Sequence, residues 1–365
     1  MGFSLETLLR LHVTTQIGVR TVEALREVFG TESKLWAAGA EILRRVPGVG
    51  PRRAKAIAEA GRDAGTWKRE AALAKKQGVT LLSYCDPAYP QALASIYDPP
   101  IILSVLGGLN EAERGEAPPS IAMVGARRCS VAGRMLAERL ARDLALSGVT
   151  VVSGLARGID QAAHRGVLAA SGRTLAVLGS GLLRPYPPEG KAIMEKIAAS
   201  GAVLSEFPLE MGPLRHHFPR RNRVISGLSR GVLVVEATRD SGSLITADWA
   251  LEQGREVLAC PGRAGEPLAG GVNRLLREGA ALVETAEEVL EALGLEGSPE
   301  ATAPVESLKG ALRIVWGALG PDPTHADDLG AATGLDVAQV VSALTQLELL
   351  GRAKATGGMH YVRVR

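Results

Sequence analysis

The middle of the chain alternates between two patterns of apolar and polar positions. Apolar runs of three to five residues, made mainly of Val, Leu, Ile and Ala, are separated by longer segments in which apolar residues recur every three or four positions. The short runs are typical of strands buried on both faces, and the longer segments are typical of amphipathic helices. We therefore predict a doubly wound α/β fold, in which helices cover both faces of a parallel sheet. The predicted strands span 121–124, 149–152, 174–178, 203–205, 232–235, 257–260 and 282–284, and the predicted helices span 131–146, 159–170, 189–199, 219–228, 244–253 and 272–278.

The two ends of the chain show the helical pattern instead. Amphipathic periodicity in the first part covers 5–11, 21–29 and 54–60, which predicts an all-helical domain. The last part predicts three helices and then a hairpin that turns at Gly357-Gly358, an order that resembles a winged helix. The three helices are expected near 307–319, 325–333 and 336–350.

Two stretches low in apolar residues, 107–119 and 295–305, have the composition of connectors. Together with the patterns above, they suggest three domains. The predicted organisation is a helical domain over 1–76, an α/β domain over 77–294, a linker over 295–306 and a winged-helix-like domain over 307–365.

The composition excludes several classes of protein. At 365 residues the chain is long enough for two or three domains, and its 46% apolar and 22% charged residues are those of a soluble globular protein. The 43 Gly and 20 Pro against 4 Phe, 4 Trp and 5 Tyr argue against a coiled coil, a disordered acidic chain and an aromatic-rich strand-stacking protein. No apolar run approaches the ~20 residues that span a bilayer, and the first residues lack the basic segment of a signal peptide. We therefore expect a cytoplasmic protein without membrane contact.

The residues that commonly bind metals give no metal-binding pattern. Cys85, Cys129 and Cys260 are odd in number and form no CxxC spacing, so we expect reduced cysteines and neither a disulfide nor zinc. His216 and His217 have no acidic or Cys partner at ligand spacing. We expect neither a metal nor a cofactor.

The net charge of +3 hides a strong division along the chain. Residues 1–76 hold 14 Lys and Arg against 8 Asp and Glu (+6), residues 118–240 hold 17 against 9 (+8), and residues 278–336 hold 2 against 12 (−10). Of the 17 cations in the middle block 15 are Arg, whose planar group suits bidentate phosphate contacts and stacking on bases. This block is either a nucleic-acid or phosphate surface or a solvated basic face.

Gly and Ser recur where the predicted strands end. In a doubly wound fold, ligands bind beyond the carboxyl ends of the strands, and open backbone N–H groups beside helix N-termini suit phosphates. No P-loop GxxxxGK[ST] is present and no GxGxxG follows the first strand, which weakens the NTPase and dinucleotide hypotheses. The alternative is that these residues only make tight turns. They lie in the segments 125–128, 153–160, 179–181, 205–208, 236–237 and 261–262.

The densest basic cluster lies at 214–227. Four arginines surround one aromatic ring, Phe218, at the start of a predicted helix. Guanidinium groups for phosphates and one ring for a base are the minimum that single-strand binding needs. The alternative is that Phe218 belongs to the core, that Asn222 ties the loop and that the arginines form surface ion pairs. The arginines are Arg215, Arg220, Arg221 and Arg223.

The helical part contains a turn with two glycines two positions apart. Gly48 and Gly50 precede a helix that starts at Pro51, where Arg52 and Arg53 add positive charge. Such a turn lets backbone N–H groups and a helix N-terminus face one phosphate. It resembles the helix–hairpin–helix motif of SAM-like domains and predicts a secondary site for a DNA backbone. The alternative is a packing element that binds nothing.

A set of motifs follows the predicted strands in a defined order. They are Val124-Gly-Ala-Arg127, Val152-Ser-Gly-Leu-Ala-Arg-Gly-Ile-Asp160 with His164, Val177-Leu-Gly-Ser-Gly181, Tyr186-Pro187, Ser205-Glu206, Phe218-Pro-Arg-Arg-Asn-Arg223, Val235-Glu-Ala237, Ser241-Gly-Ser-Leu-Ile-Thr246, Pro261-Gly262 and Gly271-Val-Asn273. Over about residues 80–285 this order resembles that of the DNA-processing protein A family (DprA/Smf).

The resemblance implies an extended Rossmann-like domain that binds single-stranded DNA and forms a homodimer. It also implies a non-enzymatic role in natural transformation, in which the protein protects incoming single strands and loads the RecA recombinase onto them. Gly125-Ala-Arg127 departs from the commoner Gly-Ser-Arg, and 183–186 lacks an Asp often seen there, which changes hydrogen bonds but not charge. Matching these motifs to those of the family implies that single-stranded DNA is held by Gly125, Arg127, Arg128, Gly154, Gly179, Gly181, Arg215, Phe218, Arg221, Asn222, Arg223, Gly242 and Ser243.

Two other functions stay open at this point. Nucleotide phosphoribohydrolases with a related sheet carry a GGxGTxxE loop with a catalytic Glu, whereas the corresponding segment here, 241–246, has none and leaves Glu236 as the candidate carboxylate. A duplex-binding regulator needs cations on the third helix of the tail. That helix shows Asp336, Gln339, Gln346 and Glu348 and no cation, which favours a protein-contact or accessory role.

Overall fold

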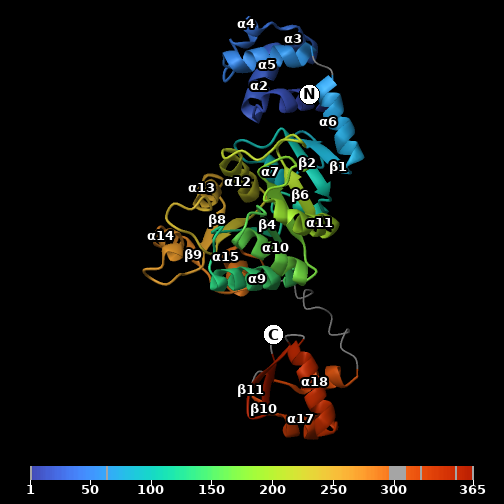
Figure 1. The fold of residues 1–365 in the computed structure, drawn as a ribbon, viewed down its shortest axis with the longest axis vertical. Coiled ribbons are helices and arrows are strands. Elements are labelled where there is room, and N and C mark those ends of the chain that lie inside the picture. The colour runs from blue at the N-terminus through green and yellow to red at the C-terminus, as the bar shows by residue number, and fades with distance from the viewer. Residues whose placement is uncertain (1, 63–64, 296–309, 321–322, 350–351, 364–365) are drawn as a thin grey trace. The chain divides into compact units, whose positions relative to one another are not determined.

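The structure is a computed structural model that describes residues 2–62, 65–295, 310–320, 323–349 and 352–363 (Figure 1). The chain divides into two compact units, Met1–Ser298 and Pro299–Arg365, and each is described by itself. Apart from Leu295, the predicted linker over 295–306 lies outside the described residues.

The larger unit begins with helices, as predicted. Ser4 starts α1, where its hydroxyl accepts the N–H of Thr7 at 3.3 Å. Buried residues such as Leu8, Leu25 and Ile57 join these helices, and Ile102 of the sheet packs into the same core. The helices are α1 (Leu5–Thr15), α2 (Val19–Phe29), α3 (Glu32–Ala37), α4 (Ala40–Leu43), α5 (Pro51–Arg62) and α6 (Gly65–Lys76).

Nine strands of the described residues form one sheet, in the order β1-β2-β6-β5-β4-β3-β7-β8-β9. The seven strands from β6 to β9 in this order run parallel, which confirms the predicted fold class. The hydrophobic pattern did not predict the other two: β2 pairs antiparallel with β6, and β1 pairs antiparallel with β2. The strands are β1 (Val79–Ser83), β2 (Ile102–Gly107), β3 (Ser120–Val124), β4 (Thr150–Ser153), β5 (Thr174–Leu178), β6 (Ala202–Ser205), β7 (Gly231–Val234), β8 (Glu256–Ala259) and β9 (Ala281–Leu282).

Helices cover both faces of this sheet (Figure 1). Alternate side chains of β3 belong to two different cores, Ile121 and Met123 to one and Ala122 and Val124 to the other. Because all residues of β3 to β7 are buried, these strands lack the polar face of a half-exposed sheet. The first core includes α9 (Val131–Leu146), α10 (Ile159–Ala169) and α15 (Ala286–Ala292), and the second includes α7 (Gln91–Ala94), α12 (His217–Gly227), α13 (Leu244–Glu252) and α14 (Gly270–Arg277). Residues of α11 (Lys191–Ser200) belong to a further core, and the short helices η1 (Pro188–Gly190) and η2 (Pro267–Ala269) also belong to this unit.

The stretch over 107–119, expected to be a connector, is an internal part of this unit. It carries α8 (Glu111–Arg114), and the side chain of Glu113 is only 2% exposed. Arg173 donates to Glu113 with 2.7 Å between Nη2 and Oε2. The expectation was wrong because a segment poor in apolar residues can be buried when its charge is paired.

The strand order reverses between β3 and β7, which lie side by side. The chain proceeds from β3 to β4, β5 and β6 on one side and from β7 to β8 and β9 on the other. At such a switch point the loops that leave the strand ends diverge and open a crevice. The candidate site is therefore expected beyond the carboxyl ends of β3 and β7.

The smaller unit has the helix and strand order of a winged helix, as predicted. Its sheet has the order β10-β12-β11, and its core contains Val315, Leu329 and Leu344. No helix among the described residues is long and apolar enough to cross a membrane. The elements are α16 (Ala311–Ala318), β10 (Thr324–His325), α17 (Ala326–Thr333), α18 (Val337–Leu349), β11 (Ala353–Gly357) and β12 (His360–Arg363).

Candidate nucleic-acid interface

A cavity of about 420 Å³ opens at the switch point. The loop after β3, the start of α10, the middle of α12 and the loop between β7 and α13 form its walls. Sequence-predicted residues contribute much of the lining, which joins four segments far apart in the chain. The lining residues include Gly125, Arg127, Arg128, Asp160, Arg221, Asn222, Thr238, Ser241, Gly242, Ser243 and Thr246.

Cations and an aromatic ring lie together beside this cavity. Arg127 and Arg128 are exposed in the loop after β3, and the guanidinium carbon of Arg127 lies 5.1 Å from the ring centroid of Phe218. Phe218 is half-buried in the first turn of α12, and the exposed Arg215 precedes it by three residues. The ring of Tyr186 lies 5.7 Å from that of Phe218. The motif Tyr186-Pro187 pointed to this tyrosine, but its side chain was not predicted to belong to the site.

Arg221 forms part of the cavity lining although its residue is only 3% exposed. Its guanidinium donates to the carbonyl oxygen of Gly154 at 2.8 Å and to that of Val177. Its Nε donates to Asn222, which in turn donates to the carbonyl oxygen of Gly242 at 3.2 Å. Burial lowers the pKa of Arg221 to about 10, and the nearby Asp160 acts in the opposite direction. These contacts tie α12 to the strand ends below it.

Gly154, which was predicted to contact single-stranded DNA, is buried beneath the cavity surface. Its N–H donates to the Asp160 carboxylate at 3.2 Å and its carbonyl accepts from Arg221, so both of its peptide groups are occupied. A Cβ atom here would lie 2.6 Å from Nη2 of Arg221. Gly154 therefore makes room for Arg221 and is not open to a ligand.

Gly179 and Gly181 are also buried. A Cβ atom on Gly179 would lie 2.7 Å from the Phe218 ring, and one on Gly181 would lie 2.0 Å from the carbonyl oxygen of Pro208. The N–H of Gly181 donates to the carbonyl of Met211 at 2.8 Å. These glycines let other groups pack closely, and the amide of Gly181 is not free for a phosphate.

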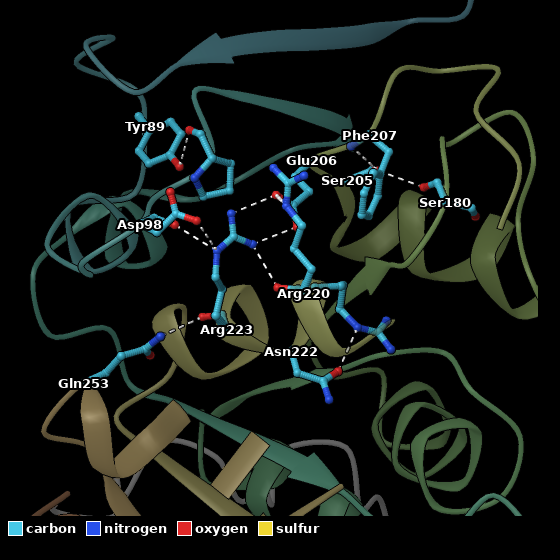
Figure 2. A network of polar contacts seen from close by, with 12 residues as sticks. Tyr89, Asp98, Ser180, Ser205, Glu206, Phe207, Arg220, Asn222, Arg223 and Gln253 are labelled. Atoms are coloured by element: carbon cyan, nitrogen blue, oxygen red, sulfur yellow. Dashed lines mark hydrogen bonds and ion pairs between the residues drawn. The ribbon is translucent and has the colours of Figure 1, made fainter. Parts of the chain in front are cut away.

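Arg223 belongs to a buried ion network rather than to the open surface (Figure 2). Its two terminal nitrogens donate to the two carboxylate oxygens of Glu206 at 2.7 and 2.8 Å, and its Nε lies 3.3 Å from Oδ2 of Asp98. Arg220 approaches the same Glu206 at 3.1 Å. Burial acts to raise the pKa of Glu206, but Arg223 and Arg220 outweigh burial and hold it below its ordinary value. The ion-pair alternative from the sequence thus describes Arg220 and Arg223, although their carboxylate partner is buried.

His12 of α1 borders the same network. It is 4% exposed, and burial lowers its pKa to about 4 although Glu206 acts to raise it. The helical part of the unit therefore places a buried imidazole close enough to Glu206 for the two groups to affect each other's pKa.

Asp160 contributes a carboxylate to the cavity lining. The oxygen Oδ2 accepts the N–H groups of Gly154 at 3.2 Å and Ala156 at 3.3 Å. Burial raises the pKa of Asp160 to about 6, although Arg221 acts in the opposite direction. Asp160 lies in the first turn of α10.

The N-terminus of α9 is already occupied by a side-chain anion. Glu236, just beyond β7, accepts the hydroxyl of Ser130 at 2.6 Å and its N–H at 2.9 Å. A Cβ atom on Gly133 would lie 2.1 Å from the carboxyl carbon of Glu236. This carboxylate occupies the place where the first helix of a Rossmann fold would bind a phosphate.

The histidines do not form a metal site. His217 stacks on Phe207 with ring centroids 4.1 Å apart, and Nδ1 of His164 lies 2.8 Å from the hydroxyl of Thr174. Burial lowers the pKa of His164 to about 3. No cluster of three or more His, Cys, Asp or Glu that could hold a metal occurs among the described residues.

The glycine turn of the helical part is exposed. Gly48 has φ +79°, which favours glycine, and Arg53 donates to its carbonyl oxygen at 3.0 Å. Gly50 and Arg52 are exposed at the start of α5. The turn has the geometry of the predicted hairpin, and its DNA contact stays a prediction.

Two family models match this chain. The model of DNA recombination-mediator protein A matches residues 80–294, and that of the DprA winged helix domain matches residues 299–359. The chain is 41% identical over 286 residues to Protein Smf of Escherichia coli, which covers 76% of this chain and 75% of that protein. It is 41% identical over 219 residues to the DNA processing protein DprA of Bacillus subtilis, covering 60% and 73%.

Two solved structures are similar. The X-ray structure of DNA processing protein A from Streptococcus pneumoniae has a TM-score of 0.67 and 34% identity, and the match covers 80% of this chain and 98% of that chain. DNA processing protein A from Helicobacter pylori, whose structure is described as revealing a single-stranded DNA binding mode, has a TM-score of 0.53 and 28% identity, covering 59% and 95%.

Replacing Glu206 by Gln tests whether the buried network holds α12. The substitution removes the buried partner of Arg223 and leaves it only the partly exposed Asp98, so we expect the free energy of unfolding to fall by about 3 kcal/mol. The control is Glu210→Gln, since Glu210 is 47% exposed and pairs with Arg69 at the surface; its effect should stay below about 1 kcal/mol. Chemical denaturation followed by tryptophan fluorescence measures both, and equal effects would contradict a structural role for Glu206.

Asp160→Asn tests the buried carboxylate through the pH dependence of stability. Because the pKa of Asp160 is about 6 in the folded protein and 3.8 ordinarily, the folded state binds this proton more tightly, and the contribution of Asp160 to stability falls as pH rises through that interval. Asn stays neutral and can still accept both N–H groups. We expect the variant to gain stability relative to the parent protein between about pH 4 and pH 7. A difference between the two unfolding curves that does not vary with pH would contradict this.

Proposed function

This chain belongs to the DNA recombination-mediator protein A family, and on that premise we propose that it binds single-stranded DNA at the switch-point cavity. The observation that carries the proposal is the cluster formed by Arg127, Arg128 and Phe218 beside the cavity. Neither arginine has an ion-pair partner within the part of the chain that the structure describes. Free guanidinium groups can bind phosphates, and the half-buried ring can stack on an unpaired base.

The role of the bound strand follows from the family. The resemblance of the motifs implies a protein of natural transformation that protects single strands and loads the RecA recombinase onto them, and the family description names a recombination mediator. The Helicobacter pylori relative is described as binding single-stranded DNA. Direct contacts in our proposal come from Gly125, Arg127, Arg128, Arg215, Phe218, Gly242 and Ser243. Gly154, Gly179, Gly181, Arg221, Asn222 and Arg223 shape the site, and Asn222 ties Arg221 to the loop at Gly242.

We infer that the protein is a binder and not an enzyme. The carboxylate proposed for a phosphoribohydrolase, Glu236, is held by Ser130 at the N-terminus of α9 and does not line the described cavity. Asp160 does line it, but one of its oxygens is held by two backbone N–H groups. Glu236 therefore has no open position for an attacking water beside it.

The exposed hairpin at Gly48 and Gly50 supports a secondary contact with a DNA backbone, since Arg52 extends the positive charge there. The smaller unit supports a different role. Its third helix, α18, carries no Lys or Arg, so we assign it a protein-contact or accessory function and not base recognition.

The exposed edge of the sheet supports a homodimer. β9 is the last strand of the sheet, and its Leu282 is 55% exposed. An unpaired strand edge that carries an exposed Leu is suited to pairing with a second copy.

The double variant Arg127→Ala, Arg128→Ala tests the DNA site. Fluorescence anisotropy with a labelled oligothymidylate should show at least about 30-fold weaker binding. The slope of log affinity against log salt concentration should also become shallower by about 1.4, because two phosphate contacts are lost. The matched control is Arg142→Ala, Arg165→Ala, which removes two surface arginines that do not line the cavity. Equal losses in both variants, or tighter binding of duplex by the parent protein, would refute the proposal.

Leu282→Arg tests the dimer. Light scattering should give a dimer for the parent protein and a monomer for the variant, since a buried Arg without a partner opposes association. Leu5→Arg, at a 46% exposed position of α1, should leave the dimer intact. A monomeric parent protein, or a dimeric Leu282 variant, would exclude the β9 edge as the interface.

A further inference from the structure

Two aromatic side chains are exposed at the surface of the protein. The chain has 4 Phe, 4 Trp and 5 Tyr, and all of them lie within the described residues. Among these, only Tyr97 and Tyr186 are exposed, at 74% and 38%. Tyr186 lies against Phe218 beside the cavity, whereas Tyr97 does not line the cavity. The aromatic ring that is most open to solvent therefore lies outside the site already described.

The ring of Tyr97 has a guanidinium group on one face. The guanidinium carbon of Arg20 lies 4.4 Å from the ring centroid, and a hydrogen bond to the Tyr97 side chain raises the pKa of Arg20. Arg20 lies in the first turn of α2, and its ion pair with Glu23 is long, at 3.8 Å. The ring contact and the hydrogen bond fix the ring, while its opposite face is open to water. A ring that is fixed in advance loses little conformational freedom when a base stacks on it.

The same combination of groups occurs at the cavity. There the guanidinium carbon of Arg127 lies 5.1 Å from the ring centroid of Phe218. An aromatic face for a base and a cation for the adjoining phosphate are what sequence-independent binding of single strands requires. Arg20 and Tyr97, the arginine–tyrosine pair, therefore repeat at a second place the chemistry that carries the proposed function.

The arginine–tyrosine pair is joined to the helix that carries Phe218. Asp98 follows Tyr97, and Nε of Arg223 donates to its carbonyl oxygen at 2.9 Å and lies 3.3 Å from its Oδ2. Arg223 and Phe218 both lie on α12, and the five residues between their positions correspond to a rise of about 7.5 Å along the helix axis. The two carboxylates of this buried network are matched by two guanidinium groups, so the network does not repel a phosphate backbone.

On its other side the arginine–tyrosine pair adjoins the exposed glycine turn. A Cβ atom on Gly18, just before α2, would lie 2.5 Å from Oδ1 of Asp98, so the start of α2 packs closely on the loop that carries the tyrosine. Thr21 follows the arginine, and a Cβ atom on Gly48 would lie 3.4 Å from its hydroxyl oxygen. The pair therefore lies between α12 and the glycine turn, the two places where DNA contacts are proposed.

We propose that Tyr97 and Arg20 form a second stacking site for an unpaired base, so that one strand runs from the cavity past Tyr97 to the glycine turn. The inference rests on the proposed binding of single strands and extends it to the helical part of the unit. The ligand at this position is a nucleobase of any type, because every base has a face that can stack. A base in a duplex is stacked on its neighbours and cannot reach the ring, so this site selects single strands.

Tyr97→Ala tests the stacking site with oligothymidylates of two lengths and the full-length protein. A strand of about 20 nucleotides should bind about tenfold more weakly to the variant, because one contact between a base and an aromatic ring is lost. A strand of about 4 nucleotides, which the cavity alone can hold, should bind equally to variant and parent protein. Fluorescence anisotropy measures both affinities.

Two further variants serve as controls. Tyr97→Phe keeps the ring and should bind the long strand nearly as the parent protein does. Leu146→Ala shortens another exposed apolar side chain, at the end of α9 that lies away from the cavity, and should leave both affinities unchanged.

Photochemical crosslinking locates the base. A long strand with iodouracil in place of some thymines is irradiated in the complex, and mass spectrometry identifies the crosslinked peptides. We expect a crosslink at Tyr97, since iodouracil reacts with an aromatic ring on which it stacks.

The length dependence separates base stacking from support of α12 through Asp98. Equal losses for the short and the long strand would mean that Tyr97 only supports the fold, and would overturn the stacking site. Unchanged binding of the long strand by Tyr97→Ala, or a crosslink at Phe218 without one at Tyr97, would overturn it too. Failure of the parent protein to bind either strand would instead refute the proposed function itself.

Discussion

The buried carboxylate of Glu206 is the group on which the position of α12 depends. Helical periodicity brings Arg220 and Arg223 to one face of α12, where both reach this carboxylate, while Arg221 points to the carbonyl oxygens at the strand ends. The ion pairs with Glu206 and the hydrogen bonds of Arg221 lie on different sides of α12, so together they anchor the helix and fix its rotation about its own axis and its distance from the strand ends. Phe218 and Asn222 take their places beside the cavity as a consequence. The basic segment therefore holds two kinds of arginine: Arg220, Arg221 and Arg223 build the site, whereas Arg215 is exposed.

The parallel part of the fold could be predicted from the pattern of apolar residues. The strand over 174–178 and the helix over 131–146 were located at their observed bounds, because buried strands and capped helices have distinct periods. The strands β1 and β2 were not predicted. In β1 the burial varies from residue to residue, and its pairing with β2 depends on contacts that no local pattern encodes. The wrong prediction for 107–119 has the same cause, a long-range contact, since the buried Glu113 pairs with an arginine about 60 positions away.

The residues of the candidate site were predicted more reliably than their roles. Arg127 and Phe218 come from motifs about 90 positions apart, and the sheet brings them into contact. Sequence alone does not reveal that Arg223 faces a carboxylate, or that Gly154 is needed for the space taken by Arg221, because both facts depend on which side of an element a residue faces.

His12 gives the helical part of the larger unit a function that its own fold does not suggest. This imidazole lies close enough to Glu206 for the carboxylate to act on its pKa, and burial keeps it uncharged. The attraction between Glu206 and Arg223 is strong because water is kept from it, and in an aqueous environment the same pair would be several times weaker. His12 of α1 thus adds a buried, uncharged side chain to the surroundings of the anchor of α12. The helical part therefore contributes to the candidate site through the surroundings of the Glu206–Arg223 pair.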